Sequence, residues 1–97
     1  MNMREREVES HLTKLCEAAG LPIYKFVPDQ APGMPDRMIL LPGRQVVWVE
    51  LKKPAGGRVA KLQEYRHKVL REAGHRVVVV WSKEQAEELV AEICRAE

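Results

Sequence analysis

The segment GMPDRMILLPGRQVVWVELKK, residues 33–53, decides the fold of this 97-residue chain. It holds two apolar runs, residues 38–41 and 46–51, on either side of the short turn sequence PGRQ. Runs of this length that are rich in Val, Ile, Leu and Trp predict β-strands, and the turn between them predicts an antiparallel hairpin. The residues that interrupt this apolar region are charged, namely Asp36, Glu50 and Lys52.

The segments before the hairpin predict one helix and one further strand. Residues 4–19 carry apolar side chains at helical spacing, and Gly20 marks the end of that helix. Residues 21–27, LPIYKFV, alternate as a short strand does. The stretch PDQAPGMPD, which is dense in Pro and Gly, then predicts a loop that leads into the hairpin.

Beyond the hairpin, residues 59–73 follow a helical pattern that stops before Gly74. Residues 76–81, RVVVVW, are apolar on both faces, which predicts a buried interior strand. Ser82 has the position of an N-cap, with Gln85 at capping-box spacing in a final helix. The inward positions of the helix over 59–73 are expected to be Leu62, Tyr65, Val69, Leu70 and Ala73.

The predicted order of elements is therefore α-β-β-β-α-β-α. A helix between the third and fourth strands allows these two strands to be parallel, whereas the hairpin is antiparallel. The sequence thus predicts an α/β fold with a mixed sheet flanked by helices. Its length predicts one domain, residues 1–97, with a modest core.

Composition narrows the class of protein. A net charge of +2 does not by itself indicate a nucleic-acid binder. Cys16 and Cys94 lack a CxxC spacing, so we expect reduced thiols in the cytoplasm. We expect neither a signal peptide nor a membrane span, because the start is charged and no apolar run approaches the required length of about 20 residues. No zinc-ligand spacing links the histidines, which are His11, His67 and His75.

The charged residues of the hairpin have positions that suit chemistry. Side chains two apart on a strand share a face, so Glu50 and Lys52 lie together while Leu51 points to the other face. Asp36 enters the neighbouring strand, which brings its carboxylate toward Glu50. Two close carboxylates repel unless a cation or a proton lies between them, and hard oxygen ligands suit Mg²⁺ or Mn²⁺. A lysine beside such a site could hold a water or stabilise charge on a phosphate.

A simpler interpretation exists for the same residues. Glu50 and Lys52 could form an ion pair on an edge strand that faces solvent, and a Glu-x-Lys pattern alone is a weak signal. The Gly-x-Pro-Asp loop in front of the hairpin favours the chemical interpretation. Trp48 shares the Glu50 face, where we expect it to pack, with stacking on an unpaired base as the alternative.

The string GMPD, then 13 residues, then ELK resembles the signature of the PD-(D/E)XK nucleases. With the helix and strand that follow, it resembles the VRR-NUC family of virus-type replication-repair nucleases, most of all the small stand-alone forms of phages. The resemblance covers nearly the whole chain. It implies a restriction-endonuclease-like core and a Mg²⁺-dependent endonuclease, in which Mn²⁺ can substitute, encoded by a phage and acting in the cytoplasm of its host.

The resemblance also assigns roles to residues of this chain. It implies that Asp36, Glu50, the carbonyl of Leu51 and the first-helix Glu9 bind metal, and that Lys52 and Gln63 complete the catalytic set. Glu5 lies one turn before Glu9 on the same edge of the helix, so the choice between them stays open. His67 is four residues after Gln63 and could contact substrate, although such a histidine is more often exposed.

Basic residues surround this predicted site. We expect them to contact the phosphates of a nucleic acid, around two loop glycines in KKPAGGRVAK; the alternative is a solvated lysine-rich loop. The set comprises Lys53, Arg58, Lys61, Arg66 and Arg37, with Arg44 as an extension.

The function that follows is a metal-dependent DNA endonuclease that leaves a 5′-phosphate and needs no nucleotide cofactor. A homodimer would double the small binding surface and offer two symmetric sites, as cleavage of a four-way junction requires, while flap or single-strand cleavage remains an alternative. Two other hypotheses are a non-catalytic nucleic-acid-binding module with the same fold, and a small interaction protein whose acids form an ion-pair network.

Overall fold

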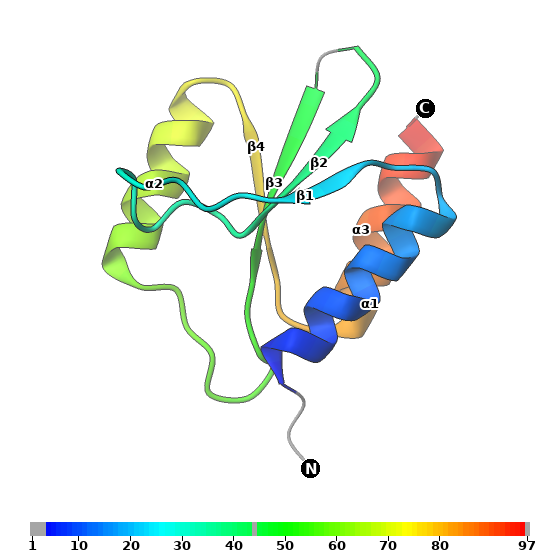
Figure 1. Cartoon of the computed structure of the whole chain (residues 1–97), viewed down its shortest axis with the longest axis horizontal. Helices are drawn as coiled ribbons and strands as arrows, with labels where there is room; N and C mark the ends of the chain where they lie inside the picture. The colour runs from blue at the N-terminus through cyan, green and yellow to red at the C-terminus, as the bar shows by residue number, and fades with distance from the viewer. Residues whose placement is uncertain (1–3, 44, 97) are drawn as a thin grey trace.

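A computed structural model describes residues 4–43 and 45–96. Its elements follow the predicted order (Figure 1): α1 (Glu5–Ala18), β1 (Ile23–Lys25), β2 (Arg37–Leu41), β3 (Gln45–Leu51), α2 (Lys61–Glu72), β4 (Arg76–Val80) and α3 (Lys83–Ala96). Arg44, in the predicted basic surface, lies outside the described residues. None of the helices in the part described is long and apolar enough to cross a membrane.

The sheet has the strand order β1-β2-β3-β4 and is mixed, as predicted. β2 and β3 form the antiparallel hairpin, with Arg37 opposite Val49. β3 and β4 are parallel, with Glu50 beside Val79, and α2 connects them. This connection is needed because two parallel strands cannot be joined by a tight turn.

Helices cover both faces of the sheet (Figure 1), with α1 and α3 side by side on one face and α2 on the other. Val47, Val49 and Leu51 of β3 belong to the main core with α1 and α3. Trp48 points to the opposite face and packs with Leu70 of α2. The alternation along β3 is therefore as predicted, and the face of Glu50 is the one under α2.

The prediction that residues 76–81 form an interior strand was wrong, since β4 lies at an edge of the sheet. Its apolar character comes from burial on both faces, with Val77 packed toward Trp48 and Val80 toward the α1–α3 side. Side chains cover part of its open edge: Arg71 donates to the Val77 carbonyl at 3.0 Å. Gln85 accepts the main-chain N–H of Trp81 at 2.7 Å. Such contacts protect an edge from pairing with another strand.

The predicted inward face of α2 was right at Leu70, which is buried, and wrong at its other positions. Leu62, Tyr65 and Val69 are 44%, 55% and 43% exposed. Ala73 is exposed as well, whereas His67, which was not predicted to face inward, is buried. α2 meets the sheet chiefly along β4, so only a narrow stripe of the helix is covered. That stripe includes His67. A prediction from the spacing of apolar residues does not count a histidine as an inward residue, so it could not find His67. The prediction for the start of α3 was right: Ser82 Oγ accepts the N–H of Gln85 at 3.1 Å.

Candidate active site

The hairpin joins the first acid to the strand that carries the second. Asp36 directly precedes β2, and its Oδ2 accepts the main-chain N–H of Leu51 at 2.9 Å. Glu50 and Lys52 lie on either side of Leu51 in sequence and share the face under α2. Their side chains approach each other, with Lys52 Nζ 3.8 Å from Glu50 Oε2. The charged residues that interrupt the apolar hairpin thus form one group.

Glu50 is 1% exposed, and α2 supplies contacts to both of its carboxylate oxygens. Gln63 Nε2 donates to Oε2 at 3.2 Å, and His67 Nε2 lies 3.4 Å from Oε1. Gln63 Oε1 in turn accepts from Lys52 Nζ and from the N–H of Ala60, both at 2.9 Å. Gln63 is therefore not a surface residue; it links the acid, the lysine and the start of α2.

The two acids are close enough to change each other's ionisation. Burial raises the pKa of Glu50 to about 8, helped by a hydrogen bond with Asp36 and by the Asp36 charge, while Lys52 opposes the rise. Burial and the Asp36 charge also raise the pKa of Glu5. Burial and the charges of Arg71 and Lys52 lower the pKa of His67, which favours a neutral ring. Half-buried Asp36 and buried Glu50 are close enough that both can ionise only with a cation between them; without one, a proton is held.

The two candidate acids of the first helix, Glu5 and Glu9, differ in their contacts. Glu9 forms an ion pair with Arg37, whose side chain is 8% exposed. Glu5 instead borders a hollow of about 280 Å³ together with Lys52, Lys53 and the loop residues 56–58. Arg37 also donates to the carbonyl of Asp36 at 3.0 Å, so its guanidinium has partners inside the protein at both of its terminal nitrogens. Arg37 is therefore buried and paired with Glu9, and it does not form part of the predicted exposed basic surface.

The donor atoms of this group fit a hard divalent cation. Asp36 and Glu50 supply carboxylate oxygens. The main-chain N–H and C=O of one residue in an antiparallel strand point to the same side. The Leu51 carbonyl therefore faces the side of β3 on which the Leu51 N–H bonds to Asp36. In residues 4–43 and 45–96, no three His, Cys, Asp or Glu side chains are arranged to hold a metal ion. A cation here would depend on the two acids, main-chain oxygen and water.

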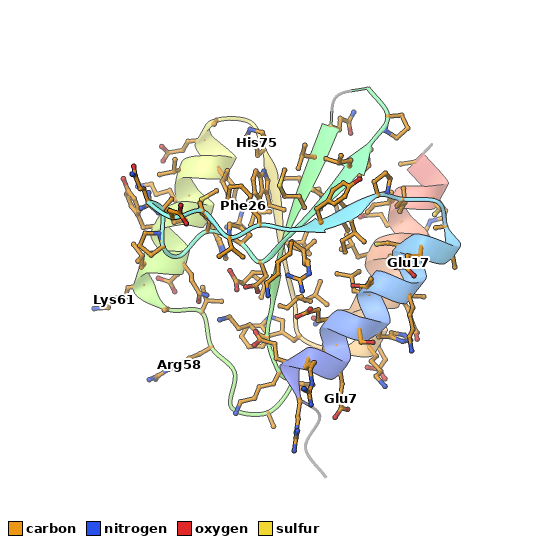
Figure 2. The ribbon with its side chains drawn as sticks, in the orientation of Figure 1. Glu7, Glu17, Phe26, Arg58, Lys61 and His75 are labelled. Atoms are coloured by element: carbon orange, nitrogen blue, oxygen red, sulfur yellow. The ribbon has the colours of Figure 1, made fainter. Side chains whose placement is uncertain are left out.

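The predicted basic surface is only partly formed. Lys53, Arg58 and Lys61 are exposed, and Figure 2 shows Arg58 and Lys61 pointing away from the body of the protein. Arg66 is half-buried: its Nε donates to the Pro32 carbonyl at 3.1 Å, and its guanidinium lies 5.5 Å from the centre of the Tyr65 ring. Those residues of the predicted basic surface that are exposed therefore lie on the loop after β3 and at the start of α2.

That loop depends on a close approach at Gly57. A Cβ added there would lie 2.5 Å from the carbonyl oxygen of Lys53 and 3.3 Å from Cβ of Lys52. The loop therefore folds back directly onto the end of the strand that carries the candidate lysine. Any other residue at position 57 would require the loop or the main chain at Lys53 to shift.

The burial of His67 was not predicted from the sequence, whereas the packing of Trp48 was. His67 is 3% exposed and contacts Glu50, so the expectation of an exposed histidine was wrong. Its spacing of four residues from Gln63 was the available signal, because such residues share a helix face. Trp48 packs as expected, with its ring centre 5.1 Å from that of Phe26 in an edge-to-face contact.

Comparison with known proteins shows the family to which the chain belongs. The chain is 35% identical over 82 residues to "Putative nuclease p44" of Acyrthosiphon pisum secondary endosymbiont phage 1, across 84% of this chain and 87% of that protein. A solved structure described as a VRR_NUC domain superposes with a TM-score of 0.82 at 29% identity, covering 90% of this chain and 94% of the other. The chain belongs to the VRR-NUC nuclease family.

No family model matches the chain, so the assignment rests on this relative and on the shared fold. The VRR-NUC match extends over the mixed sheet and its helices, which confirms the predicted fold class. The group around Asp36 and Glu50 is the candidate active site of this VRR-NUC protein.

Proposed function

We propose that this protein is a divalent-metal-dependent endonuclease that hydrolyses phosphodiester bonds of DNA. The observation that carries the proposal is the pairing of half-buried Asp36 with buried Glu50 at the hairpin, with Lys52 3.8 Å from Glu50. Membership of a nuclease family supports the reaction class. The paired acids support the dependence on metal, because the pKa of Glu50 is raised to about 8 by burial and by Asp36 even with Lys52 beside it, so a cation would favour ionisation of both acids.

The proposed cation is Mg²⁺, with Mn²⁺ as a substitute, held by Asp36, Glu50 and the Leu51 carbonyl. When bound, it would supply positive charge next to the phosphate that is cleaved. The acid from α1 that we propose to assist is Glu5 in place of Glu9, because Glu9 is paired with Arg37.

Lys52 is the proposed group that holds the attacking water or stabilises charge on the phosphate. Its Nζ is oriented by the 2.9 Å hydrogen bond to Gln63 Oε1, so the amine is fixed at the edge of the hollow before substrate arrives. Gln63 acts through this contact and through its bond to Glu50. The product would carry a 5′-phosphate.

The exposed cations Lys53, Arg58 and Lys61 are proposed to hold the DNA backbone beside the hollow. They lie on the loop after β3 and at the first residue of α2, where the helix N-terminus also favours phosphate. We propose that residues 1–97 form one nuclease domain and that the protein acts as a homodimer, since the binding surface of one chain is small. The proposed substrate is branched or flapped DNA, and the proposed location is the host cytoplasm.

The test is a cleavage assay on labelled duplex, single-stranded, flap and four-way DNA, with Mg²⁺, Mn²⁺ or EDTA. Wild-type protein is expected to cut at least one substrate only with metal, and Asp36→Ala and Lys52→Ala are expected to cut none. Binding of DNA without cleavage under either metal would instead identify a non-catalytic nucleic-acid-binding module. Equal cleavage by Lys52→Ala and wild type would refute the role given to the lysine.

A further inference from the structure

The carboxylate of Glu50 is held at two points by one helix. Gln63 and His67 are four residues apart on α2, so they lie one above the other on the same helix face. Gln63 Nε2 reaches Oε2 at 3.2 Å, and His67 Nε2 reaches Oε1 at 3.4 Å. A carboxylate with a contact at only one oxygen can turn about its last bond, whereas contacts at both oxygens fix its plane.

The two contacts differ in what else they do. Gln63 also bonds Lys52 and the N–H of Ala60, so its orientation serves the start of α2 and the lysine as well. His67 has no other side-chain hydrogen bond among the residues described, and it is 3% exposed. Burying an imidazole is costly unless its polar atoms are satisfied, and an apolar residue would pack here at lower cost. The contact with Glu50 is therefore the feature that accounts for a histidine at this position.

We propose that His67 is a positioning residue that fixes the Glu50 carboxylate toward Asp36 and thereby sets the affinity of the site for a divalent cation. This inference rests on the proposed function, because it assumes that Glu50 is a metal ligand. Residues that orient a ligand in this way typically change metal affinity by about 10–100-fold when they are replaced. His67 would not touch the DNA or the cation.

The test measures Mn²⁺ binding to the full chain without DNA, by electron paramagnetic resonance of the free ion, and the melting temperature of each variant without metal. H67L is expected to raise the dissociation constant for Mn²⁺ about 10–100-fold. H67Q is expected to restore most of the affinity, because an amide nitrogen can occupy the place of Nε2. Should H67L fail to fold, H67N carries the same prediction, because its amide is too short to reach Oε1.

Two controls separate the possible outcomes. Leu70→Ala, in the same helix face but away from Glu50, is expected to lower the melting temperature and leave Mn²⁺ affinity unchanged. Wild-type affinity in H67L would overturn the positioning role while leaving the proposed function intact. Wild-type protein that binds no Mn²⁺, or that binds it as well after Glu50→Gln, would overturn the metal site itself and the inference with it.

Discussion

The main-chain N–H of Leu51 donates a 2.9 Å hydrogen bond to Oδ2 of Asp36. This bond fixes the side chain that precedes β2 to the last residue of β3, next to the buried Glu50. The relative position of the two acids is therefore set by hairpin register and main-chain geometry. An active site built on paired strands is held more rigidly than one built on loops.

Asp36→Asn separates the charge of this residue from its structural bond. Asparagine keeps an oxygen that can accept the Leu51 N–H, so we expect little change in melting temperature and a fall in cleavage of at least about 100-fold, since the charge next to the phosphate site is lost. Asp36→Ala loses the bond as well and is expected to be less stable by about 0.5–1.5 kcal/mol. Cleavage by Asp36→Asn at the wild-type rate would contradict a role for the Asp36 charge.

Stability without metal should depend on pH through Glu50. Its pKa is about 8 in the folded protein against an ordinary value of 4.5, so the folded state binds the extra proton between these values. The contribution to stability is fully present below pH 4.5 and is lost as pH rises toward 8. Thermal melts in EDTA across this range should show the fall, and Glu50→Gln should flatten it. A wild-type slope in Glu50→Gln would contradict the assignment.

Added metal should oppose this loss. Because the cation competes with the proton on Glu50, the rise in melting temperature caused by Mg²⁺ should be larger at high pH than at low pH. Melts with and without Mg²⁺ at both ends of the range measure this difference. An effect of equal size at both ends would mean that metal binds away from Glu50.

The two acids of α1 should respond differently to loss of charge. Glu9→Gln removes the ion-pair partner of the buried Arg37, and we expect a loss of about 1–3 kcal/mol in the free energy of unfolding. Glu5→Gln removes a charge near Asp36 and is expected to weaken cleavage with little loss of stability. Urea melts and cleavage rates of both variants measure this; the reverse pattern would restore Glu9 as the first-helix acid.

Gly57→Ala tests the loop that carries the basic residues. The added Cβ meets the Lys53 carbonyl oxygen at 2.5 Å, so the loop must shift away from the end of β3. We expect DNA affinity to fall several-fold, with cleavage falling in parallel. Ala55→Gly, in the same loop, alters backbone freedom without adding an atom near Lys53; as the control for loop flexibility it is expected to keep DNA affinity near the wild-type value. Unchanged affinity in Gly57→Ala would show that the loop position does not matter for binding.

The positions of the two acids and the lysine could be predicted from the sequence, because they follow from strand alternation and from the hairpin. The alternation along β3 predicted that Glu50 and Lys52 share a face, and the hairpin predicted the approach of Asp36. The order of elements and the family resemblance were right for the same reason, since both follow from residues close together in the chain.

The errors concern contacts between distant elements. Periodicity showed that α2 is amphipathic, but it could not show that only a narrow stripe meets the sheet, which is why Tyr65 is exposed and His67 is buried. The pairing of Glu9 with Arg37, which is 28 residues further along the chain, could not be seen in the sequence, and it is the contact that favours the proposal of Glu5. Such pairings are set by tertiary packing and leave no mark in local spacing.

Asp36 and Glu50 are proposed to hold one divalent cation between them. Crystals grown with Mn²⁺ and measured near the manganese absorption edge would locate that cation. We expect an anomalous peak bounded by Asp36, Glu50 and the carbonyl of Leu51. Saturating Mn²⁺ with no peak at that position would contradict it.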